Sequence, residues 1–182
     1  MYSIVICGDS DERILTKTIA GTCMRYGGVF VSDGKNIYET GEGTEFLILC
    51  PDSESEISCG GILVVGSGIG GGYPVIKNKS IITVADTGDA ERLLFLTGHG
   101  GIVIGCSMSQ CDTVSLSCSN DSRIVSIRRE LTALDGDIIE PCEIAVRCSE
   151  DIPVYPLLAS SCVLALCGVP YENGYDIYSD PT

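Results

Sequence analysis

Apolar and polar positions alternate in blocks at the start of the chain. An apolar run over Tyr2–Cys7 predicts a buried strand, and residues 8–12 form a polar turn. Residues 13–26 carry apolar side chains at helical spacing and stop at a glycine pair, and the apolar run of residues 29–32 predicts a second strand. A strand–helix–strand opening of this kind favours a parallel sheet.

Further along the chain the pattern continues and then changes. Short apolar runs predict strands over residues 45–50, 61–65, 80–85 and 102–105, and helical spacing predicts a helix over residues 87–97. Alternating apolar and polar positions, typical of half-exposed antiparallel strands, occupy residues 112–118, 122–128 and 143–148. An apolar helix is predicted over residues 153–167, with Pro153 acceptable in its first turn and Pro156 favouring a later start.

These elements predict one α/β domain over residues 1–170. Its sheet is mostly parallel, of the P-loop or Rossmann-like kind, flanked by helices, with an antiparallel portion in the C-terminal third. Residues 171–182 are polar and are expected to form a loose tail.

Charge and hydropathy exclude several classes of partner. The formal charge of -14 disfavours nucleic acid and anionic membranes, which would be repelled. No apolar run reaches the roughly 18 residues that span a bilayer. The start of the chain lacks the basic and long apolar stretches of a signal peptide, so a cytoplasmic protein is expected.

Eleven cysteines raise the question of a metal or of disulfides. The chain has no Cys-x-x-Cys pair, and the spacings among Cys106, Cys111 and Cys118 do not match a zinc knuckle. Six cysteines lie inside or at the ends of apolar segments, where a thiol behaves as a small hydrophobic group; they are Cys7, Cys50, Cys106, Cys118, Cys162 and Cys167. We therefore expect reduced thiols and no metal site.

A glycine-rich loop offers one candidate ligand site. Gly66, Gly68 and Gly71 follow a predicted strand, and Asp86 ends the next strand, as in the dinucleotide fingerprint. That fingerprint must open a helix, whereas Gly72 and Pro74 would break one, so a flexible loop is favoured. Backbone N–H groups of such loops can still form an anion nest. The residues that this loop and the preceding Gly8 turn would offer to a ligand are Gly8, Asp9, Ser10, Gly66, Ser67, Gly68, Gly70 and Asp86.

Two other groups have chemistry to offer. His99, the only histidine, lies in a glycine-rich turn where it can cap a helix C-terminus. Asp9, Asp11 and Glu12 could bind a divalent cation through oxygen, but acidic residues before a helix also favour its dipole. The structural interpretation is preferred for both groups, so no catalytic residue and no metal ligand is predicted.

The order of the elements resembles the central, ATP-binding domain of the Mur ligase family over nearly the whole chain. The stretches that carry the resemblance are residues 4–8, 31–38, 84–93 and 154–170. The resemblance implies a ligase that uses ATP and Mg²⁺ to join amino acids to cell-wall precursors through an acyl phosphate.

The chemistry that the resemblance implies is missing from the matching positions. Where a phosphate loop needs Gly-Lys-Ser/Thr, residues 11–13 read Asp-Glu-Arg, and two carboxylates would repel a polyphosphate. The segment over residues 65–81 is too short for the family's metal-binding Asp-His region and carbamylated lysine. Pro153 and Pro156 replace two asparagines expected near the final helix.

The sequence therefore predicts a Mur-ligase-like domain that is no longer a ligase and requires no cofactor. It would act in binding or scaffolding, as a homo-oligomer or with a protein partner such as a cell-wall enzyme. The alternative, from another class, is an enzyme or sensor that binds a small nucleotide or anion through residues 66–72.

Overall fold

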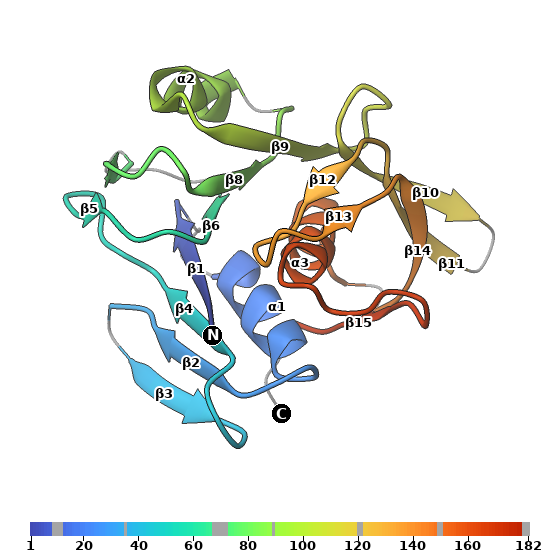
Figure 1. Ribbon diagram of the computed structural model, residues 1–182, viewed down its shortest axis with the longest axis horizontal. Coiled ribbons are helices and arrows are strands. Elements are labelled where there is room, and N and C mark those ends of the chain that lie inside the picture. The colour runs from blue at the N-terminus through green and yellow to red at the C-terminus, as the bar shows by residue number, and fades with distance from the viewer. Residues whose placement is uncertain are drawn as a thin grey trace.

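One mixed sheet dominates the computed structural model, which describes residues 1–8, 13–34, 36–66, 73–88, 90–119, 122–148 and 151–179. Eleven strands within these residues form the sheet (Figure 1). In spatial order they are β15 (Tyr175–Ile177), β14 (Cys142–Cys148), β11 (Ser122–Ile127), β10 (Val114–Ser119), β9 (Ile102–Ser107), β8 (Ile82–Ala85), β6 (Ile62–Val65), β1 (Tyr2–Cys7), β4 (Phe46–Leu49), β2 (Val29–Ser32) and β3 (Ile37–Thr40).

The predicted fold class is confirmed. Strands β2, β4, β1, β6, β8 and β9 are parallel neighbours, and β10 continues them parallel to β9. The C-terminal third then turns antiparallel through β10, β11 and β14. Strand β14 alternates buried and more exposed residues, as its pattern indicates. The expectation of half-exposed strands is wrong for β10 and β11, because residues 114–116 and 125–127 are buried, the polar Ser115 and Ser126 included. Strands β6 and β8 are buried along their whole length.

Two hydrophobic clusters cover the two faces of the parallel strands. On one face the strands curve around α1 (Ile14–Cys23) and α3 (Val154–Leu166), which lie side by side (Figure 1). On the other face α2 (Ala90–His99) packs through Leu96, together with β5 (Glu56–Ile57) and β7 (Val75–Ile76). Neighbouring residues of β1 belong to opposite clusters, because successive side chains of a strand point to opposite faces.

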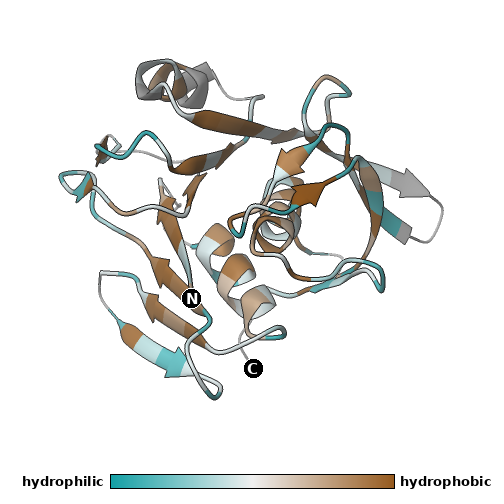
Figure 2. Ribbon diagram, viewed as in Figure 1, coloured by the Kyte–Doolittle hydropathy of each residue, from teal (hydrophilic) through white to brown (hydrophobic). Residues whose placement is uncertain are grey.

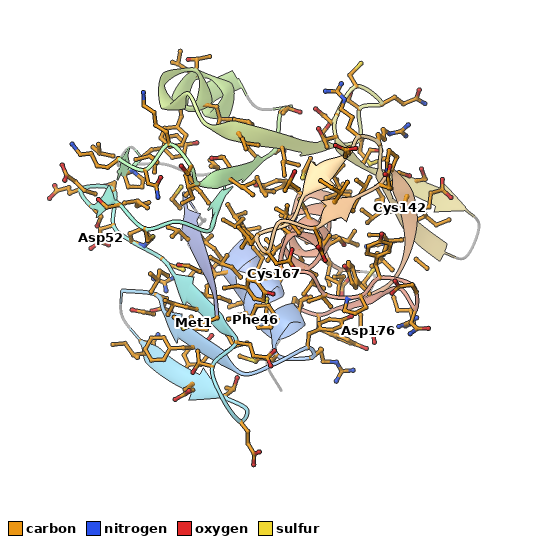
Figure 3. All side chains as sticks on the ribbon, viewed as in Figure 1. Met1, Phe46, Asp52, Cys142, Cys167 and Asp176 are labelled. Atoms are coloured by element: carbon orange, nitrogen blue, oxygen red, sulfur yellow. The ribbon has the colours of Figure 1, made fainter. Side chains whose placement is uncertain are left out.

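Hydrophobic residues lie in the interior of the molecule and polar residues lie at its rim. The strands and the two central helices are the most hydrophobic parts, and the loops around them are polar (Figure 2). Phe46 and Cys167 lie among the core side chains, whereas Asp52 and Asp176 lie toward the rim (Figure 3).

Helix α3 lies in the middle of the core. Each residue from Pro156 to Leu166 is buried, so the helix is apolar around its whole circumference rather than on one stripe. It begins at Val154, although Pro156 favoured a later start. Pro156 is the third residue of the helix, where a backbone N–H has no acceptor within the helix, so proline costs little there. No helix in the described part of the chain is long and apolar enough to cross a bilayer.

The expectation of a loose tail is wrong over Tyr175–Ile177. These residues form β15, which pairs in parallel with β14 and places Tyr175 and Ile177 fully inside the core. Asp176 between them faces outward and forms an ion pair with Arg147, with the carboxylate oxygen 2.6 Å from Nε. The segment is polar on average, but its two apolar residues alternate, and this suffices for an edge strand. The domain bounds of residues 1–170 stay a prediction.

Several short strands were also not predicted. They are β3, β5, β7, and the hairpin of β12 (Leu131–Thr132) and β13 (Ile138–Ile139). Most of these strands have two residues, too few for any periodicity to show.

Candidate binding site at the carboxyl edge of the sheet

Three of the predicted ligand residues come together at one edge of the sheet. Gly8, Gly66 and Asp86 directly follow β1, β6 and β8, which are adjacent and parallel. The register pairs Cys7 with Val65 and Val65 with Ala85, so the three strands end level with one another. The backbone N–H of Gly66 donates to the Cys7 carbonyl at 2.7 Å. The other predicted ligand residues, Asp9, Ser10, Ser67, Gly68 and Gly70, lie outside the described residues.

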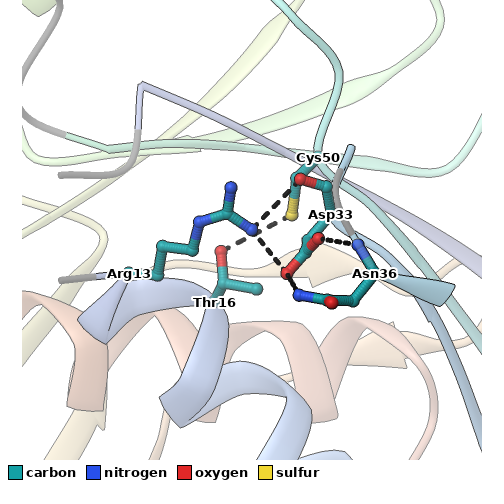
Figure 4. A network of polar contacts seen from close by, with 5 residues as sticks. All are labelled: Arg13, Thr16, Asp33, Asn36 and Cys50. Atoms are coloured by element: carbon teal, nitrogen blue, oxygen red, sulfur yellow. Dashed lines mark hydrogen bonds and ion pairs between the residues drawn. The ribbon is translucent and has the colours of Figure 1, made fainter. Parts of the chain in front are cut away.

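The start of α1 is held by an ion pair between Arg13 and Asp33 (Figure 4). The Arg13 Nη1 lies 2.5 Å from the Asp33 carboxylate and donates to the Asp33 backbone carbonyl at 3.1 Å. The Asn36 backbone N–H donates to the other carboxylate oxygen at 2.7 Å. Asp33 follows β2, and the parallel arrangement of the strands brings this residue to the same edge as the start of α1.

Arg13 also has an unusual backbone conformation. Its φ of 52° lies in the left-handed region, and it is the one non-glycine residue with positive φ among those described. A side chain disfavours this conformation by roughly 1–2 kcal/mol, so surrounding contacts must hold it. The ion pair with Asp33 supplies such a contact. One turn into the helix, the Thr16 hydroxyl lies 3.5 Å from the Cys50 sulfur at the end of β4.

A second polar group ties the ends of β8 and β9 together. The Asp112 carboxylate accepts hydrogen bonds from the hydroxyl of Thr87, at 2.6 Å, and from the hydroxyl of Ser107. Gly105 makes room for this arrangement, since a Cβ there would lie 2.7 Å from the Asp112 oxygen. Asp86 accepts from the Gly88 backbone N–H at 2.9 Å, which shapes the turn after β8.

The phenol of Tyr155, in the first turn of α3, reaches the strand ends from the helical face. Its hydroxyl lies 2.7 Å from the Val65 carbonyl and 3.2 Å from the Val84 carbonyl. The helix start is thereby anchored to the two strands that precede Gly66 and Asp86.

No sequence pattern predicted a role for these hydroxyl and carboxylate groups. Thr87 and Ser107 stand just after predicted strands and Asp112 begins one, and these positions at strand ends were the available signal. Arg13 was considered only as a residue that replaces a phosphate-loop hydroxyl, and Tyr155 only as part of the closing helix.

A cavity of about 320 Å³ opens beside the start of α1. The described residues that line it are Ile14, Lys17, Asp151, Pro153 and Ser179. This cavity lies between the first turns of α1 and α3, with one lysine and one aspartate in its wall.

The described residues offer no metal cluster, and the thiols of Cys7 and Cys106 are not activated. No three His, Cys, Asp or Glu side chains gather among them as metal ligands. Burial raises the pKa of the Cys7 thiol, which ends β1, to about 12. The pKa of Cys106 is also raised, by a hydrogen bond with Cys162 and by burial. Both groups are thus protonated at neutral pH and act as small hydrophobic side chains. The imidazole of His99 lies outside the described side chains.

Comparison with solved structures identifies the fold. The MurF ligase from Thermotoga maritima in complex with ADP superimposes with a TM-score of 0.54 at 12% identity, over 94% of this chain and 46% of that protein. A UDP-N-acetylmuramoyl-L-alanyl-D-glutamate–2,6-diaminopimelate ligase matches with a TM-score of 0.57 at 10% identity, over 94% of this chain and 44% of the ligase. The chain has a Mur-ligase-like fold.

The likeness is one of fold, since the identities are low. No protein-family model matches the sequence, and no curated protein matches it either. The chain spans less than half the length of both ligases.

Proposed function

We propose that this chain is a cytoplasmic Mur-ligase-like domain that has lost ATP-driven ligation. It acts in binding or scaffolding, as a homo-oligomer or beside an enzyme of cell-wall metabolism. The observation that carries this proposal is the Arg13–Asp33 ion pair at the start of α1.

The physical argument concerns what a phosphate loop must provide. Backbone N–H groups wrap the phosphates, a lysine neutralises them, and a hydroxyl holds Mg²⁺. Asp11 and Glu12 replace the glycine and the lysine with negative charge. Arg13 replaces the hydroxyl, and Asp33 already neutralises its charge within the chain. A polyphosphate brought to this helix start would meet net negative charge, and position 13 offers no hydroxyl to hold Mg²⁺.

Mg-ATP is accordingly expected to leave the melting temperature unchanged. A ligand at 100 times its Kd adds about 2.7 kcal/mol, and each kcal/mol shifts the melting temperature of a chain of this size by about 2–4 °C. Differential scanning fluorimetry with millimolar Mg-ATP would detect such a shift easily. Phosphate release, measured in parallel, should stay at the level of buffer. A dose-dependent shift of several degrees in the wild-type chain would refute the proposal.

A variant separates the ion pair from the rest of the loop. Asp33→Asn releases the Arg13 guanidinium but leaves Asp11 and Glu12 in place. We therefore expect Mg-ATP to leave the melting temperature of this variant unchanged as well. If Mg-ATP raised the melting temperature of the variant but not of the wild type, the ion pair rather than the acidic loop would be the feature that prevents Mg-ATP from binding.

A second candidate function rests on the level ends of β1, β6 and β8. Backbone N–H groups after parallel strands can converge on an anion, and the Gly8 turn and the loop after Gly66 begin side by side there. The N–H of Gly66 itself is bonded to the Cys7 carbonyl, so the donors would be those of the following residues. On this hypothesis, residues 66–72 hold a phosphate or small nucleotide, with Asp86 nearby.

Alanine substitutions in the loop decide between the two functions. If the loop only links strands, Gly68→Ala and Gly70→Ala should each change the free energy of unfolding by about 1 kcal/mol or less, and phosphate should not affect the melting temperature of any form. If the loop is an anion nest, phosphate should stabilise the wild-type chain, and the added Cβ atoms should abolish that effect. We expect the first result. Gly43→Ala, in an exposed turn at φ 74°, controls for backbone strain alone.

A further inference from the structure

A groove with apolar walls lies at the opposite end of the molecule, where α3 ends. The β12–β13 hairpin and the connection from α3 to β15 enclose a cavity of about 240 Å³, which we call the hairpin groove. Ile138, Val169, Pro170 and Tyr171 form much of its wall. Ile138, at the lip, is 52% exposed, a large apolar side chain left in water.

The hairpin groove is held in shape by backbone hydrogen bonds. The Leu134 N–H, in the hairpin turn, donates to the Leu166 carbonyl of α3 at 2.8 Å. Gly168, at φ 70°, reverses the chain after α3, so that the Val169 N–H donates back to the Leu164 carbonyl at 3.0 Å. The hairpin and the helix end therefore form one body, and the groove does not depend on a flexible loop.

The charged side chains that line the hairpin groove have one sign. Asp137 and Glu172 line it, and no Lys or Arg is among its described lining residues. Glu172 and Glu140 lie close enough to Tyr171 to raise the pKa of its phenol, after the larger effect of burial. The end of α3 adds the negative pole of a helix dipole. The groove thus combines an apolar wall with a negative potential.

We propose that the hairpin groove binds an arginine or lysine side chain from a basic segment of a partner protein. These side chains carry an apolar stem under a cationic head, which matches an apolar wall beneath carboxylates. Arginine suits the groove better, since its guanidinium can also stack on the Tyr171 ring. The volume lies below the roughly 300–1,000 Å³ of pockets for small molecules and fits a single anchoring side chain. The net charge of -14 disfavours a second copy of this chain as the occupant.

This inference rests on the proposed binding role and names the chemistry of the partner, but the inference and the proposed function are tested separately. The hairpin groove lies at the amino edge of the sheet, beside Tyr2, whereas the start of α1 lies at the carboxyl edge. A basic partner could bind whether or not Mg-ATP does.

The test uses the full chain and the peptide acetyl-Leu-Arg-Leu-amide, with amide chemical shifts as the readout. We expect the peptide at millimolar concentration to shift the amides of Ile138, Val169 and Tyr171. The matched peptide with citrulline in place of arginine has the same shape without the charge, and it should bind at least about threefold more weakly.

Charge variants complete the test. Asp137→Asn/Glu172→Gln should weaken binding of the arginine peptide by about threefold to tenfold, since each exposed charge contributes modestly. Glu42→Gln/Glu54→Gln removes the same charge from exposed positions elsewhere and should leave binding within twofold of wild type, an allowance of about 0.4 kcal/mol. Equal weakening by both pairs, equal binding of the citrulline peptide, or shifts confined to amides outside the groove would each overturn the proposal.

Discussion

Replacing Tyr175 with alanine is expected to lower the free energy of unfolding by about 3–5 kcal/mol, the usual cost of removing a large buried aromatic side chain. Tyr175 is fully buried and is the largest side chain in the core. Its ring meets Tyr26 edge to face with centroids 5.9 Å apart, and its hydroxyl donates to the Val169 carbonyl at 2.8 Å. The substitution removes these contacts together and leaves a cavity between α1, α3 and β15.

Urea unfolding followed by circular dichroism measures this effect. Tyr178→Ala is the matched control, because it removes a tyrosine three positions further along that is 37% exposed and lies over Arg25, with 4.6 Å from the guanidinium carbon to the ring centre. The control should lose about 1 kcal/mol or less. Equal unfolding midpoints for Tyr175→Ala and the wild type would mean that residues 175–177 do not belong to the core.

The second large effect is expected at alkaline pH. Burial raises the pKa of Cys7 and of Cys167 from the ordinary value of 9.0 to about 12. Between these values the thiols are ionised in the unfolded chain and protonated in the folded one, so the folded state binds more protons. Stability is therefore fully present below pH 9 and is lost as the pH rises toward 12.

The slope of this loss follows from linkage alone. Each buried thiol lowers the free energy of unfolding by about 1.4 kcal/mol per pH unit, so the pair lowers it by about 2.7. From pH 9 to pH 12 the pair lowers the free energy of unfolding by about 8 kcal/mol, so a domain at the lower end of the usual range of roughly 5–15 kcal/mol should unfold near pH 11. Cys23, Cys106 and Tyr175 have pKa values shifted in the same direction and add to the effect.

Chemical unfolding at a series of pH values under reducing conditions tests the assignment. The variant Cys7→Ala/Cys167→Ala starts from a lower stability. Above pH 9 its free energy of unfolding should fall less steeply than that of the wild type, and the two slopes should differ by about 2.7 kcal/mol per pH unit. Tris(2-carboxyethyl)phosphine keeps the remaining thiols reduced throughout. Parallel curves for the variant and the wild type would show that these thiols do not control alkaline unfolding.

Local pattern was sufficient to predict the sheet's central part and its helices. Residues 62–65 form a continuous apolar run, and such a run forms a strand buried on both faces. The shorter run over residues 29–31 also predicted a strand, and its burial alternates. Alternation over residues 122–128 and 143–148 predicted the antiparallel portion, and β14 does alternate buried and more exposed residues. These strands and helices depend on residues that are close together in the sequence, so the local pattern is enough to predict them.

The candidate site depended on the tertiary structure. Arg13 and Asp33 lie 20 positions apart, and Tyr155 reaches the Val65 carbonyl from 90 positions away, so no local period relates them. Each contact exists because parallel strands end level at one edge and a helix starts there.

The chain by itself determined which segments are apolar, the net charge and the absence of a phosphate-loop sequence. The tertiary structure decided that three residues of a polar tail complete the sheet, and that an arginine is held in a left-handed turn by a distant aspartate. It also decided that a hairpin and a helix end enclose an acidic groove. Periodicity reports which face of an element is buried, whereas register and packing select the partner of that face, and the partner is distant in sequence.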